Sequence, residues 1–309
     1  MQGTRGGIGR IVAMGIALAL ALLLVVAAEA RAGKYAVAQC GWYVGADADW
    51  ADTTGGAKFR ADGYCVPPAG ADPFESAHLT SLSREGQSTV SGNRFARWRW
   101  TAPPGTSIRQ LRGTWWHLLR DGIERRIGAI NWAGGFEPVL TAAATDTARR
   151  EFVLGFPVPI AGIEDRLLCA RAEDRWCSLE PGSWSSLRAL TITLEDERNP
   201  GGGIGGDLTV PGWQRGARTA SIGGNDLGSG VRFGETLLDG ARVALTEYPC
   251  EKISIGGEWR ATRMQPCLGT VSQFQSIQTA SFSDGPHSLV HCITDFSANS
   301  ACTVPTVVR

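Results

Sequence analysis

Asn199-Pro200-Gly201-Gly202-Gly203-Ile204-Gly205-Gly206 divides the sequence into two parts, and strand-like alternation of apolar and polar residues occurs on both sides of it. Glycine loses much conformational freedom on ordering and offers no side chain to pack, so a run of glycines is typical of a linker. Pro200 favours the end of the preceding strand. We therefore predict an all-β protein with two domains, residues 33–198 and 207–309, joined by a glycine-rich linker at 199–206.

The first 32 residues are typical of an export signal peptide. Arg5 and Arg10 give a positive start, and an uninterrupted stretch of apolar residues and glycine follows at 11–28. Pairs of small residues at 28–30 and 30–32 match signal cleavage sites, and we expect cleavage after Ala32. An uncleaved membrane anchor is the alternative, because about 18 apolar residues can just span a bilayer. The sequence predicts a protein that is secreted, extracellular or associated with the cell surface.

Export decides how the cysteines are interpreted. The sequence has eight, all beyond the signal, and an even number in an exported chain favours disulfides. Many pairings are possible, but their order in the chain suggests that neighbours pair. The expected bridges are Cys40–Cys65, Cys169–Cys177, Cys250–Cys267 and Cys292–Cys302. No Cys-x-x-Cys spacing occurs, so a zinc ribbon or a thioredoxin-type site has no support.

The first domain is expected to be a jelly-roll-like β-sandwich that carries the binding surface, because most of the tryptophans fall in it. Adjacent residues of a strand face opposite ways, so one of Trp115 and Trp116 should be buried and the other should face outward. An outward tryptophan is a stacking platform for a sugar ring. The alternative is that a second layer or a loop covers it. Trp115 and Trp116 are the candidate ligand-binding residues.

One loop of the first domain carries carboxylates at a spacing that could gather around calcium. These are Asp47, Asp49 and Asp52. The match to a calcium loop is poor, because the expected glycine is missing and Lys58 stands where a closing glutamate should be. A solvated loop or a helix N-cap is the preferred interpretation. The sequence therefore predicts no cofactor and no metal, with calcium at this loop as the alternative.

The sequence holds no GxSxG, HExxH or P-loop motif. Alternation places Glu195 and Glu197 on one face of a strand, about 7 Å apart, a separation at which two carboxylates can cleave a glycoside. These acids are contiguous with Asp196 and end a strand just before the predicted linker, which favours a solvated strand end. We predict that the protein is not an enzyme; the alternative is a polysaccharide-active glycosidase or lyase that uses Glu195 and Glu197.

The second domain has short strands and frequent turns, a pattern that indicates a sandwich. Asp284-Gly285, the alternating residues 287–294, Asp295 and Asn299 match the closing strands of bacterial extracellular immunoglobulin-like domains, with Ala298 where those domains have glycine. Residues 226–231 likewise resemble their early Asp-x-x-Ser-Gly-Val loop. With residues 98–106 of the first domain, the layout is similar to large secreted β-sandwich proteins of GC-rich bacteria. The resemblance implies an immunoglobulin-like second domain and transfers no catalytic residue.

Charge limits the possible partners. The formal net charge is +0 at pH 7, and no basic patch stands out, so nucleic acid is not an expected partner. We expect a secreted, non-enzymatic adhesion or carbohydrate-binding protein whose partner is a polysaccharide or a cell-surface component. A purely structural surface module is a further alternative.

Overall fold

The computed structural model describes residues 32–39, 50–54, 59–64, 78–83, 89–92, 94–119, 122–142, 149–178 and 183–309. These residues form β-strands and two short 3-10 helices, with no α-helix among them, so the predicted all-β class is confirmed. None of their helices is long and apolar enough to cross a membrane. The predicted export signal lies outside the described residues, and the chain from Ala32 to Arg309 forms one compact unit.

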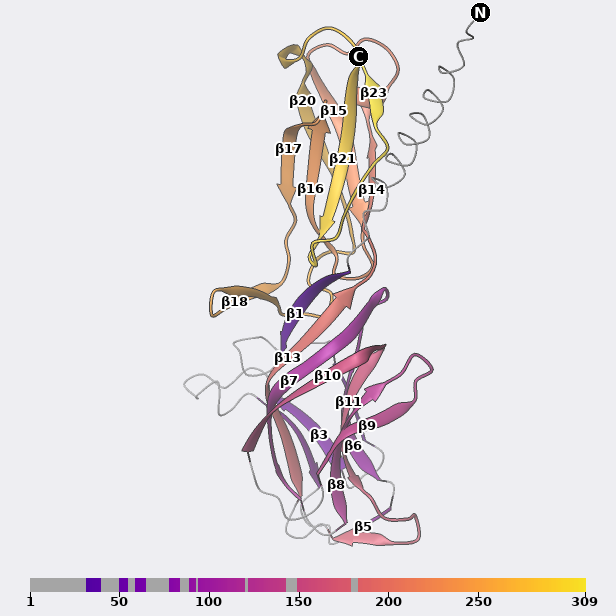
Figure 1. Ribbon diagram of the computed structural model, residues 1–309, viewed down its shortest axis with the longest axis vertical. Coiled ribbons are helices and arrows are strands. Elements are labelled where there is room, and N and C mark those ends of the chain that lie inside the picture. The colour runs from indigo at the N-terminus through magenta and orange to yellow at the C-terminus, as the bar shows by residue number, and fades with distance from the viewer. Residues whose placement is uncertain are drawn as a thin grey trace, which may run out of the picture. The chain divides into compact units, whose positions relative to one another are not determined.

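The first part of the chain forms a sandwich of two sheets (Figure 1). The larger sheet has the order β10-β7-β13-β1-β19-β18, and β4 and β3 extend from β13. Its strands are Arg149–Ile160 (β10), Thr106–Leu118 (β7), Trp184–Asp196 (β13), Gly33–Gln39 (β1), Glu258–Ala261 (β19), Lys252–Ile255 (β18), His78–Ser83 (β4) and Phe59–Tyr64 (β3).

The second sheet of this sandwich has the order β2-β6-β11-β8-β9. Its strands are Trp50–Thr54 (β2), Phe95–Thr101 (β6), Gly162–Cys169 (β11), Ile123–Ile130 (β8) and Phe136–Ala142 (β9). A separate two-stranded pair joins Thr89–Ser91 (β5) to Trp176–Ser178 (β12).

Alternation along β13 decides which of its residues enter the core. Leu190, Ile192 and Leu194 are fully buried and belong to one apolar cluster with Trp100 and Ile163 of the second sheet. Because successive side chains point to opposite faces, Thr191 and Thr193 lie on the outer face of the larger sheet. β13 therefore contributes to the core and to an outer surface at once.

The second part of the chain forms a smaller sandwich of two antiparallel sheets. One sheet holds Gly201–Gly205 (β14), Ala217–Asn225 (β15) and Thr270–Gln278 (β20). The other holds Ala241–Glu247 (β17), Val231–Leu238 (β16), His287–Asp295 (β21), Ser300–Cys302 (β22) and Thr306–Val308 (β23). The 3-10 helices are Asp207–Thr209 (η1) and Thr279–Ser281 (η2).

The glycine run is not the predicted linker. Gly201–Gly205 forms β14 and pairs with β15 over its whole length. The physical reason is the close approach of Ile293, which is fully buried: a Cβ added at Gly202 would lie 3.2 Å from its Cγ1, and one added at Gly224 of β15 would lie 2.7 Å from its Cδ1. Glycine at 202 and 224 therefore makes room for a neighbouring side chain, whereas a Cβ added at Gly203 or Gly205 would meet nothing within 4 Å.

No single position in the described part of the chain separates the two sandwiches. The hairpin β18–β19 follows β17 of the smaller sandwich, yet it extends the larger sheet of the first one, where Ala261 pairs with Val37. The Tyr35 hydroxyl donates to the Met264 carbonyl at 2.6 Å. This exchange of segments accounts for the single compact unit formed by residues 32–309.

Three of the four predicted disulfides are present. They are Cys169–Cys177, Cys250–Cys267 and Cys292–Cys302. Cys40 and Cys65 lie outside the described residues. The Cys250–Cys267 bridge closes the segment that carries β18 and β19, so it restrains the part of the chain that joins the first sandwich.

Gly224→Ala tests this explanation of the glycines. The added methyl group meets three side-chain atoms of Ile293 at 2.7–3.2 Å, so overpacking is expected to lower the free energy of unfolding by about 1–3 kcal/mol. Gly203→Ala is the matched control, because a Cβ there meets nothing within 4 Å. Urea denaturation measures both variants, and equal stability of the two would contradict the explanation.

Candidate functional site

The outer face of the larger sheet carries small and polar side chains where β1, β7 and β13 run side by side. The register aligns Gln110 of β7, Thr193 of β13 and Ala36 of β1 in one row. The row before it holds Ser107, Glu195 and Lys34. Each of these residues alternates with a core residue on its own strand, so the packing of the core fixes where they lie.

A shallow groove with a volume of about 560 Å³ lies on this face. Its lining comes from β1, β7, β10 and β13: Lys34, Arg109, Gln110, Gly155, Phe156, Pro157 and Thr193. The pairing of β7 with β13 shifts register at Thr193/Leu194, and the pairing of β10 with β7 shifts between Gly155 and Ile160. Such bulges re-aim side chains, and here they bring Arg109 and Pro157 to the groove.

The charges in the groove are arranged asymmetrically. Arg109 donates through Nε to the Glu195 carboxylate and through Nη1 to the Pro157 carbonyl at 3.3 Å. Lys34 Nζ lies 3.6 Å from Glu195 Oε1. The Lys34 side chain is 60% exposed and that of Glu195 only 11%. A molecule in the groove therefore meets the two cations, and the carboxylate lies behind them.

This arrangement is suited to binding. Lysine, arginine, glutamine and threonine provide hydrogen-bond donors in one shallow depression, and the exposed ring of Pro157 adds an apolar surface. A few placed polar groups beside apolar surface are what small-molecule and sugar sites require. The guanidinium of Arg109 is already held by two acceptors, so its orientation is fixed before a ligand arrives.

The structure separates Trp115 and Trp116 onto opposite faces, as alternation predicts. Trp115 is 5% exposed and lies in the core, where the Arg125 guanidinium sits 5.1 Å from its ring and Phe152 contacts its edge. It is therefore a packing residue and not the expected stacking platform. Trp116 is half-buried, and its ring lies edge-on to Trp184 at 4.9 Å. A ligand role for Trp116 stays a prediction.

Four other tryptophans are the exposed ones among the described residues. They are Trp132 at 64%, Trp176 at 54%, Trp213 at 70% and Trp259 at 59%. Sequence reasoning did not single them out, although a signal exists: Trp132 precedes the turn at Gly134 and Trp259 follows the turn at Gly256. A tryptophan beside a hairpin turn reaches the end of a sheet, where an opposing layer seldom covers it.

The two candidate catalytic glutamates have different surroundings. Glu195 is 8% exposed and is ion-paired with Arg109 and Lys34 at the groove wall. Glu197 follows the end of β13 and is exposed. The prediction of a solvated strand end therefore fits Glu197 and not Glu195, because two cations and the neighbouring strands shield Glu195.

Three buried aspartates meet where the two sandwiches join, and sequence reasoning missed this cluster. Asp196 ends β13, Asp226 follows β15 and Asp295 ends β21, and one oxygen of each lies within 4.8 Å of the others. Their exposed fractions are 0%, 3% and 1%. Carboxylate oxygens of this kind are the ligands that calcium takes. Two of the three lie in the motifs at 226–231 and 284–299, so the signal was in the sequence.

The oxygens of this aspartate cluster already have donors. The Ser229 amide donates to Asp196 Oδ2 at 2.8 Å, and the Gly230 amide donates to Asp226 Oδ2 at 2.6 Å. Burial, and secondarily the charge of Asp196, raises the pKa of Asp295 to about 7. Burial raises the pKa of Asp226 as well. Near neutral pH a proton held by Asp295 therefore reduces the repulsion that this buried carboxylate would otherwise feel.

The loop at which calcium was the alternative lies mostly outside the described residues. Asp47 and Asp49 lie outside the described residues. Asp52 belongs to β2, where the structure gives the course of the backbone but not the side chain. Calcium at these residues stays an unsupported alternative.

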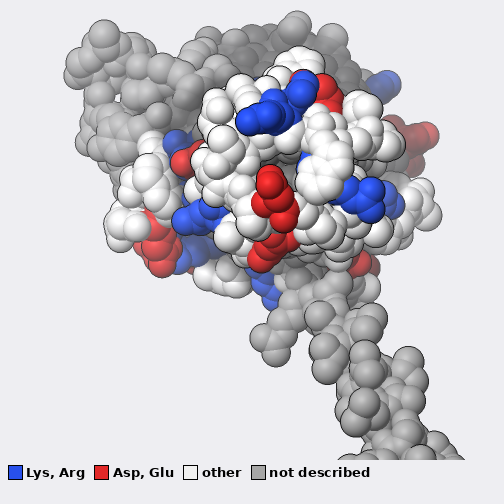
Figure 2. Space-filling model, turned by 90° about the horizontal axis from the view of Figure 1, so that it is seen from above, with Lys and Arg blue, Asp and Glu red and all other residues white. Residues whose placement is uncertain are grey.

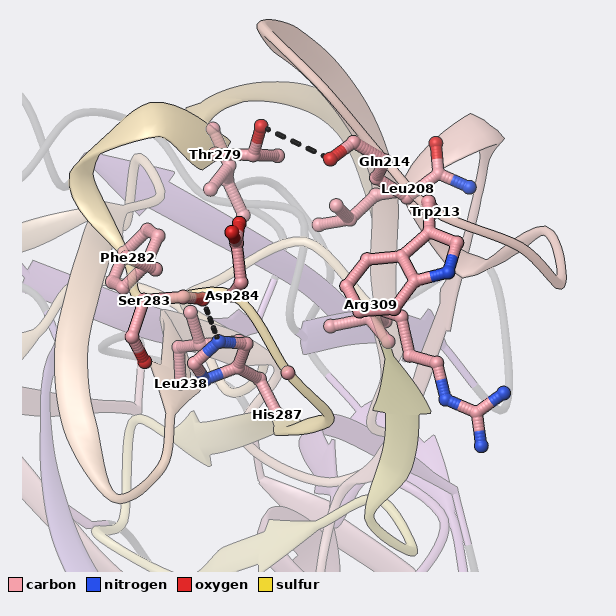
Figure 3. A pocket seen from close by; sticks show the side chains of 13 residues that line it. Leu208, Trp213, Gln214, Leu238, Thr279, Phe282, Ser283, Asp284, His287 and Arg309 are labelled. Carbon is pink, nitrogen blue, oxygen red and sulfur yellow. Dashed lines mark hydrogen bonds between the residues drawn. The ribbon is translucent and has the colours of Figure 1, made fainter.

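A second, much smaller cavity of about 50 Å³ opens at the end of the smaller sandwich (Figure 3). Leu208, Leu238 and Ile277 form apolar parts of its lining, and Trp213 and His287 are among the residues at its rim. The His287 ring bonds to the Ser283 carbonyl at 2.8 Å. Because a water molecule alone occupies about 30 Å³ in the liquid, this space is too small for a sugar ring.

The face of the molecule seen in Figure 2 shows basic and acidic side chains interspersed among uncharged ones. No continuous area of one sign covers the described part of that face.

Comparisons with known proteins give low similarities. No family model matches the chain, and no curated protein matches it. A family 29 carbohydrate-binding module complexed with mannohexaose has a TM-score of 0.32 at 10% identity, covering 52% of this chain and 92% of that one. A GH2 beta-galacturonidase from Eisenbergiella tayi bound to galacturonate has a TM-score of 0.21 at 11% identity, covering 83% and 43%.

A truncated AlyQ with CBM32 and alginate lyase domains has a TM-score of 0.23 at 10% identity, covering 78% of this chain and 80% of that one. All of these TM-scores are low. The ligands of these proteins are therefore not transferred to this chain, and its function is inferred from its own groove.

The aspartate cluster predicts a pH dependence of stability. An unfolded aspartate releases its proton near 3.8, whereas Asp295 holds it until about pH 7. Protonation therefore favours the folded state, and this contribution is lost as the pH rises through 7. Between about pH 5.5 and about pH 8, linkage predicts a loss of about 2 kcal/mol, seen as a fall of a few degrees in the thermal midpoint.

Asp295→Asn should flatten this part of the profile, because the side chain no longer titrates. Asp284→Asn is the control, since Asp284 is an exposed carboxylate away from the cluster and its loss should leave the slope unchanged. A midpoint that rises with pH in this range would contradict a raised pKa of Asp295. A rise on adding calcium at high pH, absent in Asp295→Asn, would show that the cluster binds metal instead.

Proposed function

We propose that this protein is exported and binds polysaccharide without chemically altering it, at or outside the cell surface. The observation that carries the proposal is the groove on the outer face of β1, β7, β10 and β13, with its hydrogen-bond donors and its volume of about 560 Å³. Three disulfides and the export signal expected at residues 1–32 support a place in an oxidising compartment.

The smaller sandwich would act as a spacer or a second contact. It stabilises the first sandwich through the hairpin β18–β19, which extends the sheet that carries the groove. A role as part of a larger adhesive or surface protein is compatible with this arrangement, and the immunoglobulin-like character of the smaller sandwich belongs to the same proposal.

Gly155→Leu tests the position of the binding site. A Cβ at Gly155 meets nothing within 4 Å and the backbone is not in the left-handed region, so the leucine side chain should enter the groove without disturbing the sheet. Affinity for the polysaccharide should fall about tenfold or more, which is about 1.4 kcal/mol. Binding is measured calorimetrically on a panel of soluble polysaccharides and isolated cell walls.

Gly203→Leu is the matched control, because its Cβ site is equally open but lies on β14 of the smaller sandwich. It should bind like the unaltered protein. Equal binding by both variants, or loss in both, would place the site elsewhere, and no binding to any glycan in the panel would overturn the proposed function.

The position of Glu195 at the groove wall keeps one alternative open, a polysaccharide-active enzyme that uses Glu195 and Glu197. We expect no release of reducing ends and no unsaturated product when the protein is incubated with polysaccharides that it binds. Turnover that Glu195→Gln and Glu197→Gln each abolish would establish the enzyme, because both carboxyl groups are needed for glycoside hydrolysis.

A further inference from the structure

We infer that the ligand of the groove is an acidic polysaccharide, one that carries carboxylate or sulfate groups along a hydroxyl-rich chain. This inference rests on the proposed function and narrows it to a class of glycan. The charges that face the groove, rather than any similarity to another protein, carry it.

The residues that line the groove include two cations, Lys34 and Arg109, and no carboxylate. The nearest carboxylate, Glu195, lies behind them with its oxygens occupied by both. The Arg109 side chain remains 27% exposed and that of Lys34 60% exposed. Glu195 balances one of these two positive charges, so a neutral ligand would leave the other uncompensated, whereas an acidic group would pair with it.

A second pair of cations lies one row beyond the middle of the groove. Arg112 of β7 is paired opposite Thr191 of β13, and Arg260 of β19 donates from Nη1 to Thr191 Oγ1 at 3.2 Å. Arg112 is exposed and forms no ion pair with the residues that the structure describes. Glu258, 3.8 Å from Arg260, is 80% exposed and lies at the margin.

The two pairs of cations flank a neutral middle row. That row contains Gln110, Thr193 and Ala36. Alternate residues of a strand are about 7 Å apart, so the two cationic rows are separated by about 14 Å. The spacing fits a chain in which acidic groups recur and hydroxyl-bearing stretches lie between them. The hydroxyls would bond to Gln110 and Thr193 while the acidic groups meet the cations.

Arg109 and Lys34 would contact an acidic group in different ways, because one side chain is held in place and the other is free to move. The fork of Arg109 is held by Glu195 and the Pro157 carbonyl, and its orientation is set for a planar anion such as a carboxylate. Lys34 is a flexible point charge that can follow the ligand. Removing Arg109 would leave Glu195 shielded from water without its main partner, so Lys34 and Arg112 are the better positions for substitution.

The experiment compares glycans that share a backbone and differ in charge. The pairs are dextran and dextran sulfate, hydroxyethyl cellulose and carboxymethyl cellulose, and methyl-esterified pectin and pectate. Binding of the purified protein is measured at low and at high salt. At least one acidic member should bind about tenfold or more tightly than its neutral partner, and salt should weaken that binding because it screens the exposed cations.

The double variant Lys34→Gln, Arg112→Gln should lose most of this preference and most of the salt dependence. The control Arg232→Gln, Arg242→Gln removes two arginines from β16 and β17 of the smaller sandwich. It should keep both the preference for acidic glycans and the salt dependence. A thermal midpoint close to that of the unaltered protein verifies folding.

Binding of acidic glycans that is lost only in the double groove variant supports the inference. Equal, salt-independent binding of both members of each pair overturns it and leaves the proposed function standing. Binding of no glycan overturns both. A further outcome is that poly-glutamate or duplex DNA binds as tightly as the acidic glycans and loses binding in the same variant. That result would overturn the inference that the ligand is a polysaccharide and would show a general polyanion site.

Discussion

The alternation of side chains along β13 is the constraint on which the rest of the molecule depends. Leu190, Ile192 and Leu194 enter the core and cannot be shifted by one residue without exposing all three. The same register sets Thr193 in the groove and Glu195 at its wall. The strand then ends at Asp196, which is fully buried and accepts a hydrogen bond from the Ser229 amide of the smaller sandwich. Core, groove and junction are therefore fixed by one strand.

The junction combines apolar packing, in which Phe296 and Met264 belong to the same core cluster as Tyr35, with a set of buried polar contacts. Asn299 donates from Nδ2 to the Asp196 carbonyl at 3.0 Å and accepts from the Gly33 amide at 3.0 Å. The turn that presents it places Ala298 at a φ of 73°, in the left-handed region that usually takes glycine. Buried polar contacts of this kind are costly when incomplete, so they specify one geometry of the chain at this point.

Much of the fold could be predicted from the sequence because the signals are local. The order of the cysteines in the chain predicted three of the disulfides, each of which joins neighbours in that order. The glycine run was misinterpreted because composition cannot distinguish freedom from close packing, and only the position of Ile293 shows which applies. The hairpin β18–β19 was not anticipated in the first sandwich, since its partner, Val37, lies more than two hundred residues away.

The groove could not be found from the sequence because the residues that line it are far apart in the chain. It brings together Lys34, Arg109, Gly155 and Thr193 from four strands, and none of these residues forms a motif with its sequence neighbours. Tryptophan density pointed to the sandwich that carries the groove, but Trp115 fills the core of that sandwich and does not line the groove. For the aspartate cluster, two of the three members stood in recognisable motifs, and only the fold showed that all three meet.

Amide hydrogen exchange with and without a saturating polysaccharide tests the central claim, that the groove is the binding site, most directly. A bound chain should slow exchange in the parts of β7, β10 and β13 that border the groove, around Gln110, Gly155 and Thr193. The strands β14, β15 and β20 should exchange as before. Protection confined to the smaller sandwich, or to the loops that carry the exposed tryptophans, would contradict the account.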